Sequence, residues 1–147
     1  MNKLFIKCIW VISIGLFVPL LAQSETKNGC AKIITLLIVD GYSSGRDLPR
    51  VAREYINKNH PDTLLRIAHM HSKNGRPPSN MAATYDAHNF DLHFTGKAAD
   101  RESWIRKLAP TAIIAGAEPG VLLADRLAAK FNKELGVPSN GVLQARR

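Results

Sequence analysis

Apolar residues between Ala31 and Phe131 fall into short continuous runs separated by polar and helical stretches. Four of these runs predict β-strands, at Ile33–Asp40, Leu64–His71, Phe90–Phe94 and Thr111–Gly116. The first run is unbroken and rich in β-branched residues, which is typical of a strand buried on both faces in a parallel sheet.

The stretches between these runs carry apolar residues at steps of three and four, the spacing of a helix with one buried face. Three helices follow from it: one carrying Leu48, Val51, Ala52, Tyr55 and Ile56, one capped by Asp100 and running through Leu108, and one from Val121 through Phe131. Pro61 stops the first helix near Asn59, and Gly136 caps the last.

Strands alternating with helices predict an α/β fold: a small open parallel sheet of about four strands flanked by helices, of Rossmann-like type. The carboxyl ends of parallel strands share one edge of the sheet, and ligands of open α/β sheets bind there. Two glycine-containing loops, 41–47 and 116–120, are expected at this edge.

The segment 1–24 is treated separately from the domain at 31–147. Lys3 and Lys7 precede 15 uncharged residues, Cys8 to Ala22, and Ala22-Gln23-Ser24 follows. This order is typical of a cleaved signal peptide and is short for a membrane span. We therefore expect a secreted or periplasmic protein if cleavage occurs; the alternatives are a membrane-anchored or a cytoplasmic chain.

The net charge of the chain is +8, and removal of 1–24 leaves 18 basic and 12 acidic side chains, a net charge of +6. The lysines are scattered and the few aromatic residues do not cluster, so nucleic-acid binding is not indicated. We expect a mild field that favours anionic ligands. Cys30 would be the single cysteine after cleavage, so the core rather than a disulfide must hold the domain.

The loop Gly41-Tyr-Ser-Ser-Gly45 matches neither the P-loop nor the dinucleotide-binding pattern. Its glycines suit a tight turn in which Ser44 or Asp47 caps the following helix, and Arg46 is available to an anion. In the second loop, Glu118 is favoured by the dipole of the helix that follows. It is also a candidate to accept hydrogen bonds from a ligand.

The same loop also fits G-x-S-x-G, the nucleophile-elbow pattern, with Ser43 at its centre. Asp86 or Asp91, followed by His88 or His93, would complete a Ser, Asp, His order. No oxyanion-loop motif accompanies them, so no catalytic residue is assigned. His69 and His71 share one face of a strand but have no third ligand at a telling distance, so no metal site is assigned either.

Three stretches carry a family resemblance: "LIVDGYSSGRDL", "PPSNMAATYD", and "PTAIIAGAEPGVLLADRLAAKF" followed by "GVPSNGVLQARR". Over Ile33–Arg147 the chain resembles the N-terminal, pre-ATP-grasp domain of ATP-grasp ligases of the carboxylate–amine branch, which includes the L-amino-acid ligases. The blocks Ala115–Leu127 and Asn140–Arg147 are the most specific parts of the resemblance.

The resemblance implies an N-terminal, substrate-side domain of an enzyme that activates a carboxylate as an acyl phosphate and transfers it to an amine. A small amino-acid-like or carboxylate ligand would lie against Tyr42, Ser43, Ser44, Gly45, Arg46 and Glu118. The ATP- and Mg²⁺-binding regions of the family would follow Arg147. A helix predicted to start at Ser139 or Asn140 has run for only about two turns at that point. A truncated or split domain that is not catalytic alone, and that pairs with the missing ATP-grasp domain, is therefore expected, with no cofactor of its own.

Two other hypotheses stay open at this point. The chain is also consistent with an exported small-ligand-binding α/β module, because of the signal-like segment 1–24. A non-functional gene remnant is the third interpretation.

Overall fold

The computed structural model describes residues 31–73 and 76–139. The predicted signal segment 1–24, both cysteines and the helix start predicted after Ser139 lie outside the described residues. None of the described helices has the length and apolar character needed to cross a membrane.

The described chain forms seven main elements, which alternate as the sequence predicts. They are β1 (Lys32–Val39), α1 (Leu48–Asn59), β2 (Thr63–Met70), β3 (Leu92–His93), α2 (Arg101–Leu108), β4 (Ala112–Ala115) and α3 (Val121–Leu135). The four strands form one sheet in the order β3-β2-β1-β4, and every neighbouring pair is parallel. The predicted α/β fold with an open parallel sheet is therefore confirmed.

β1 lies inside the sheet, between β2 and β4, and the order in which the chain adds strands reverses at β1. The chain first moves outward from β1 to β2 and β3, and then crosses back to β4 on the other side of β1. Val39 pairs with Met70 on one side and with Ala115 on the other, so three strands end in one row. Such a reversal point is where open α/β sheets bind ligands beyond the strand ends.

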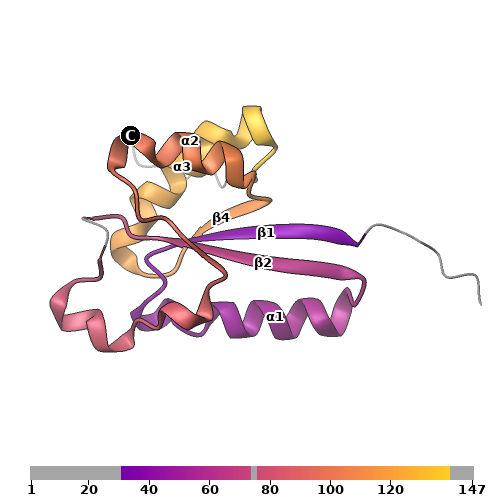
Figure 1. The fold of residues 1–147 in the computed structure, drawn as a ribbon, viewed down its shortest axis with the longest axis horizontal. Coiled ribbons are helices and arrows are strands. Elements are labelled where there is room, and N and C mark those ends of the chain that lie inside the picture. The colour runs from indigo at the N-terminus through magenta and orange to yellow at the C-terminus, as the bar shows by residue number, and fades with distance from the viewer. Residues whose placement is uncertain (1–30, 74–75, 140–147) are drawn as a thin grey trace, which may run out of the picture.

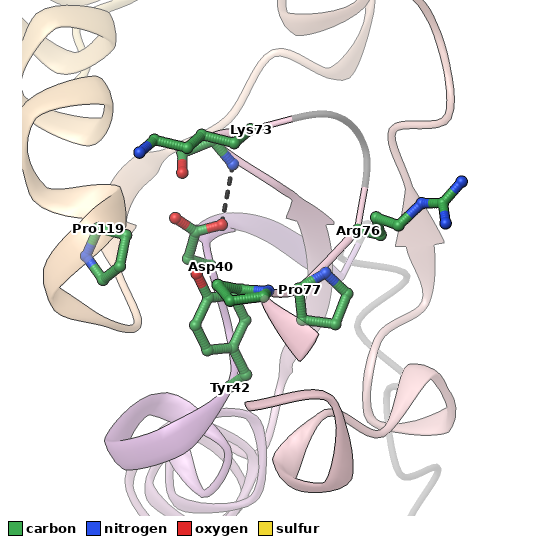
Figure 2. Close-up of a pocket in the computed structure, with 8 residues that line it drawn as sticks. Asp40, Tyr42, Lys73, Arg76, Pro77 and Pro119 are labelled. Atoms are coloured by element: carbon green, nitrogen blue, oxygen red, sulfur yellow. Dashed lines mark hydrogen bonds between the residues drawn. The ribbon is translucent and has the colours of Figure 1, made fainter. Parts of the chain in front are cut away.

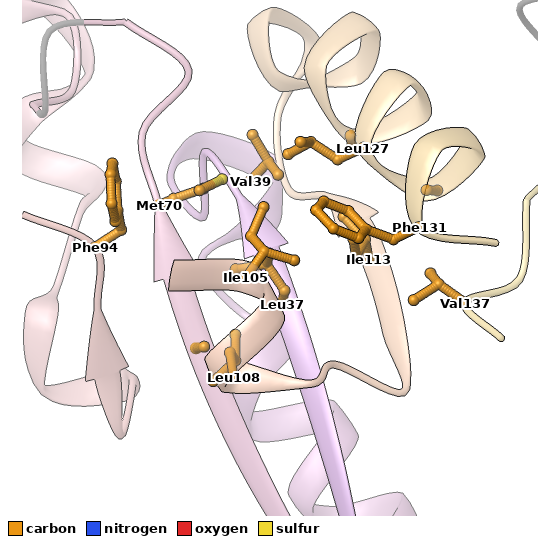
Figure 3. Packing of buried hydrophobic residues seen from close by; sticks show 13 residues of the cluster. Leu37, Val39, Met70, Phe94, Ile105, Leu108, Ile113, Leu127, Phe131 and Val137 are labelled. Atoms are coloured by element: carbon orange, nitrogen blue, oxygen red, sulfur yellow. The ribbon is translucent and has the colours of Figure 1, made fainter. Parts of the chain in front are cut away.

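Helices cover both faces of the sheet: α1 lies on one side, and α2 and α3 lie together on the other (Figure 1). The larger core lies under α2 and α3, where Leu37 and Val39 of β1 meet Ile105 and Phe131 (Figure 3). Ile38, which points to the opposite face, belongs to the smaller core under α1. This alternation explains why the β1 sequence is apolar at successive positions.

The apolar stripe predicted for the first helix is wider than the face that α1 buries. Ile56 is buried and Leu48 and Ala52 are partly buried against the sheet, whereas Val51 and Tyr55 are exposed. Among the described residues, α1 and the segment 79–90 cover this face. Residues at the margin of the stripe therefore face solvent.

The predicted side-chain caps of the first two helices are wrong. Asp47 and Asp100 stand at the N-cap positions of α1 and α2, but neither side chain makes a capping hydrogen bond. An N-cap residue that accepts from the helix normally has extended backbone angles. Here both residues have helical angles, because short 3₁₀ turns lead into the helices. The predicted cap at the end of α3 is confirmed: Gly136 has a φ of 70° and its amide donates to Asn132 O.

The third strand is shorter than the predicted Phe90–Phe94 and consists of Leu92 and His93. Its ladder ends at Asp91, whose side-chain Oδ2 accepts the Ile67 amide N–H at 2.7 Å, while its own amide donates to Ile67 O. A carboxylate thus takes the place of a strand carbonyl. Phe90 and Phe94 are still buried, one in each core.

Candidate functional site

The two loops at the strand ends are in direct backbone contact. A Cβ atom on Gly45 would lie 2.2 Å from Gly116 O, and one on Gly116 would lie 2.6 Å from Asp40 O. Side chains at these positions would separate the loops. The glycines therefore allow the turn after β1 and the turn after β4 to close around the end of β1.

Asp40 is the residue on which these loops converge. It follows β1 directly, is 1% exposed, and has a φ of 59°, a left-handed conformation that few residues other than glycine adopt. The start of α3 lies against it, because a Cβ on Gly120 would be 3.1 Å from Asp40 Oδ2. The helix dipole favours a carboxylate at this position.

The two oxygens of Asp40 have different surroundings. Oδ1 accepts the Ser72 amide N–H at 2.8 Å, the bond drawn as a dashed line in Figure 2. Oδ2 is buried and has no hydrogen-bond partner among the described residues. The neighbours of the carboxylate are the start of α3 and the Tyr42 side chain, whose raised pKa reflects burial, the Asp40 charge and hydrogen bonding to Asp40.

The Asp40 carboxyl keeps its charge in this buried position. Burial raises its pKa, but the interactions with His71 and Ser72 outweigh this effect and hold the pKa below its usual value. A buried, ionised carboxylate is therefore present directly after β1 at neutral pH.

Asp40 is one of the residues that line a pocket of about 610 Å³. Its walls come from the ends of β1 and β2 and from the loop before α3: Asp40, Tyr42, Ser72, Lys73, Arg76, Pro77, Pro78 and Pro119. Figure 2 shows the carboxylate between the Tyr42 ring and the Lys73 chain, with Pro119 to one side. The volume lies in the range of sites for small organic ligands.

A second orphan polar atom lies beside Asp40. His71 is 7% exposed, and its Nδ1 is 3.8 Å from Asp40 Oδ1 and has no hydrogen-bond partner among the described residues. The His71 ring stacks with Tyr42 and meets His69 edge to face. His71 thus packs beside the Asp40 carboxylate and does not itself line the pocket.

Next to His71, a chain of hydrogen bonds through His69 fixes the Gly41 turn to the segment 79–93. The Gly41 amide donates to His69 Nε2 at 3.1 Å, so the proton of the neutral His69 ring is on Nδ1, 3.4 Å from Tyr85 Oη. His93 Nε2 lies 3.0 Å from Ala87 O, which can only accept, so that nitrogen carries the His93 proton.

The Tyr85 hydroxyl joins the two histidines. It can accept from His69 Nδ1 and donate to His93 Nδ1, which is 3.2 Å away. Burial, together with the neighbouring His71 and His93, lowers the pKa of His69 to about 3, in agreement with a neutral ring. These contacts make the histidines parts of a scaffold that holds the site.

Of the residues that the sequence predicts for the substrate edge, only Tyr42 lines this pocket. It is 1% exposed, and burial and the Asp40 charge raise its pKa to about 12. Gly45 is buried against Gly116 and serves loop packing. Ser44 Oγ donates to Gly116 O at 3.4 Å and so also ties the two loops together.

Arg46 and Glu118 lie outside the pocket, and both are exposed. Arg46 pairs with the adjacent Asp47 and lines a smaller hollow of about 300 Å³ near Tyr85. Glu118 begins the turn before α3, one residue before Pro119, which is the residue that reaches the pocket.

Ser43 has the strained backbone of a nucleophile elbow but lacks its partners. Its φ is 54°, and its amide donates to Thr84 Oγ1. No histidine of the described chain hydrogen-bonds to its hydroxyl, and the candidate acids are engaged elsewhere. Asp86 binds His88, which is 97% exposed, and Asp91 binds Ile67 and Arg53.

The sequence analysis missed the residues that make the pocket polar: Asp40, Ser72, Lys73 and Arg76. One signal was present. Asp40 is a charged residue directly after an apolar strand, at the edge where ligands bind, although the predicted strand includes it. In the structure β1 ends at Val39, and Asp40 turns its side chain beneath α3.

Within the described ranges, no three His, Cys, Asp or Glu side chains form a group that could hold a metal ion. Comparison with protein families, with curated proteins and with solved structures finds no match for this chain.

Proposed function

We propose that this chain supplies the N-terminal, substrate-side domain of an ATP-grasp carboxylate–amine ligase, and that its pocket at Asp40 holds a small amino-acid-like or carboxylate ligand. The observation that carries the binding part of the proposal is the pocket of about 610 Å³ that Asp40 lines at the reversal point of the sheet. The ligase part is supported by the sequence resemblance over Ile33–Arg147.

The residues that line the pocket suit ligand binding by this domain, with ATP and Mg²⁺ held elsewhere in the family. Its polar groups are one carboxylate, one phenol, one hydroxyl and two cations, which suit recognition of a small polar molecule. In the family, ATP and Mg²⁺ are held by other regions. We therefore expect this domain to bind its ligand without turning over ATP.

Calorimetric titration of the full chain with L-amino acids, singly and in mixtures, tests the proposal. Saturable binding to wild type that is lost in Asp40→Asn is expected. A parallel assay with ATP, Mg²⁺ and the same amino acids should release no ADP above background. Absence of binding by every amino acid and simple carboxylate tried would contradict the ligand assignment, and ADP release would contradict the division of labour.

An exported binding module is the second candidate, and the signal-like segment 1–24 is the feature that favours it. In that case the same pocket would hold a ligand without chemistry. Cell fractionation with N-terminal sequencing separates the two: a mature chain starting near Gln23 or Glu25 outside the cytoplasm supports export. An intact Met1 in the cytosol contradicts export.

A further inference from the structure

The sheet is covered unevenly on the side of α2 and α3. In Figure 1 these helices lie over the carboxyl-terminal part of the strands, and β1 and β2 extend beyond them at their amino-terminal ends. β4 also begins late, because Ala112 pairs with Leu36 in the middle of β1. The described residues therefore leave the first rungs of β1 and β2 uncovered on this side.

Two large apolar side chains stand on these uncovered rungs. Ile33 and Leu64 are paired across β1 and β2, and they are 56% and 58% exposed. Alternation along the strands places them on the same side as Leu37 and Met70, which belong to the core under α2 and α3. The uncovered rungs thus continue the apolar surface of the core into solvent, and covering them is favourable.

Charged residues flank Leu64 along the same strand. Asp62 directly precedes β2 and Arg66 follows Leu64 by two residues, so an acid, an apolar residue and a base succeed one another at steps of two. Arg66 shares the face of Leu64 and donates to Thr35 Oγ1 across the sheet, and both charged residues are exposed. This order is self-complementary: when one copy is reversed against another, acid meets base and leucine meets leucine.

We propose that two copies of this chain associate through the uncovered face, which consists of Ile33, Leu64 and Arg66 with Asp62 at its end. The two-fold axis lies between the two sheets and runs perpendicular to β2 at the level of Leu64. It places Ile33 and Leu64 against the same residues of the second copy. Asp62 of each copy then meets Arg66 of the other, so the ion pair forms twice, as in any two-fold interface.

The outline of the domain allows this packing. α2 and α3 rise above one part of the sheet and leave the other part bare, so the domain has a step on this side (Figure 1). With the strands of the two copies antiparallel, the helices of each copy stand beyond the amino-terminal ends of the strands of the other. They border the contact between the sheets without blocking it.

The proposed dimer leaves both ligand pockets accessible. The pocket lies beyond the carboxyl ends of β1 and β2, where Asp40 and Ser72 line it, whereas the uncovered face lies at the amino ends of the same strands. The two pockets would therefore point away from each other. Dimerisation is independent of the ligand proposed for the pocket, and neither proposal fails with the other.

Sedimentation equilibrium of the full chain over a range of concentrations tests the proposal. Leu64→Ser removes an apolar contact that both copies make, so it should weaken dimerisation at least about 10-fold. Leu122→Ser is the matched control and should leave dimerisation unchanged. Leu122 is similarly exposed, at 49%, but it lies in the first turn of α3, at the opposite end of the sheet.

A charge swap tests the ion pairs. Asp62→Lys and Arg66→Glu each bring like charges together in both symmetry-related pairs, so each should weaken dimerisation about 5-fold or more. The double variant restores opposite charges and should dimerise within about 3-fold of wild type. Arg66→Glu also loses the bond to Thr35, and circular dichroism checks that it folds. Rescue by Asp62→Lys separates lost pairing from misfolding.

Three results would overturn the proposal. A monomer at every concentration up to about 1 mM would leave the uncovered face to another occupant, such as the missing ATP-grasp domain. Association that Leu64→Ser and Leu122→Ser change equally would place the contact elsewhere on the chain. A double charge variant that associates no better than the single variants would exclude the antiparallel arrangement about Leu64.

Discussion

His69 makes the stability of the domain sensitive to mild acid. The ring is 1% exposed, accepts the Gly41 amide at Nε2, and lies 4.5 Å from the Phe90 ring, centroid to centroid. Protonation of Nε2 would break the bond to Gly41 and place a charge in an apolar cluster. Burial first, and then His71 and His93, lower the pKa of His69 from 6.5 to about 3.

The size of the effect follows from proton linkage. In the unfolded chain this histidine binds a proton below pH 6.5, but in the folded chain it does not do so until about pH 3. Stability is therefore lost as the pH falls from 6.5 toward 3. Between pH 7 and pH 5 the loss from this one group is about 2 kcal/mol. The Asp40 carboxyl, with a pKa below its usual 3.8, contributes only below this window.

Urea unfolding of the full chain, followed by circular dichroism at pH 7 and at pH 5, measures this effect. His69→Gln retains an acceptor for the Gly41 amide but cannot titrate, so its loss of free energy over this interval should be smaller than that of wild type by about 2 kcal/mol. His60→Gln changes an exposed ring with no carboxylate partner among the described residues and is the matched control. An unchanged pH dependence in His69→Gln would refute the assignment of a buried, neutral His69.

Three further substitutions, each with a comparison variant, test the packing of the loops and the core by thermal or urea unfolding. Gly45→Ala would place Cβ 2.2 Å from Gly116 O, so a loss of about 2–3 kcal/mol is expected. Gly96→Ala, whose Cβ would meet side chains rather than backbone, should lose less; equal losses would contradict the backbone contact. Phe131→Ala should cost about 3–5 kcal/mol because the ring is fully buried, against about 1 kcal/mol for Phe131→Leu, and a loss below about 1 kcal/mol for alanine would show that the core is loosely packed. Gly136→Ala should cost about 1 kcal/mol through the positive φ alone, since the space around Gly136 is open, and Gly136→Asn should cost less; a neutral alanine variant would contradict the left-handed cap.

The strands and helices could be predicted because their burial imposes a period on the sequence. From Leu36 to Val39 every residue of β1 is apolar because both faces of the strand are covered there. Gly136 marks the end of α3 because a residue tolerant of positive φ is needed at that position. The helix starts were less predictable. Whether Asp47 caps α1 depends on backbone angles set by the preceding turn, and the residue type does not reveal these angles.

The site was predictable at the level of the sheet edge but not of its residues. The order of strands and helices indicates which loops gather at that edge, and the family resemblance added Tyr42, which does line the pocket. Lys73 and Arg76 lie in "SKNGRPPSN", whose Gly, Pro and Asn residues indicate a turn. Nothing local in this stretch shows that its residues line a pocket with Asp40. The pocket forms where segments that are distant in the sequence come into contact, and a single sequence does not reveal such contacts.

The most direct test of the central claim is a titration of the ¹⁵N-labelled full chain with a mixture of L-amino acids, followed by amide chemical shifts. Binding at Asp40 predicts saturable shifts of the Ser72 and Gly120 amides, because Ser72 donates to Asp40 Oδ1 and Gly120 lies against Oδ2. The same titration of Asp40→Asn should leave them unchanged. Shifts that persist in Asp40→Asn, or that occur only around Arg46 and Glu118, would contradict the assignment of Asp40 as the ligand-binding residue.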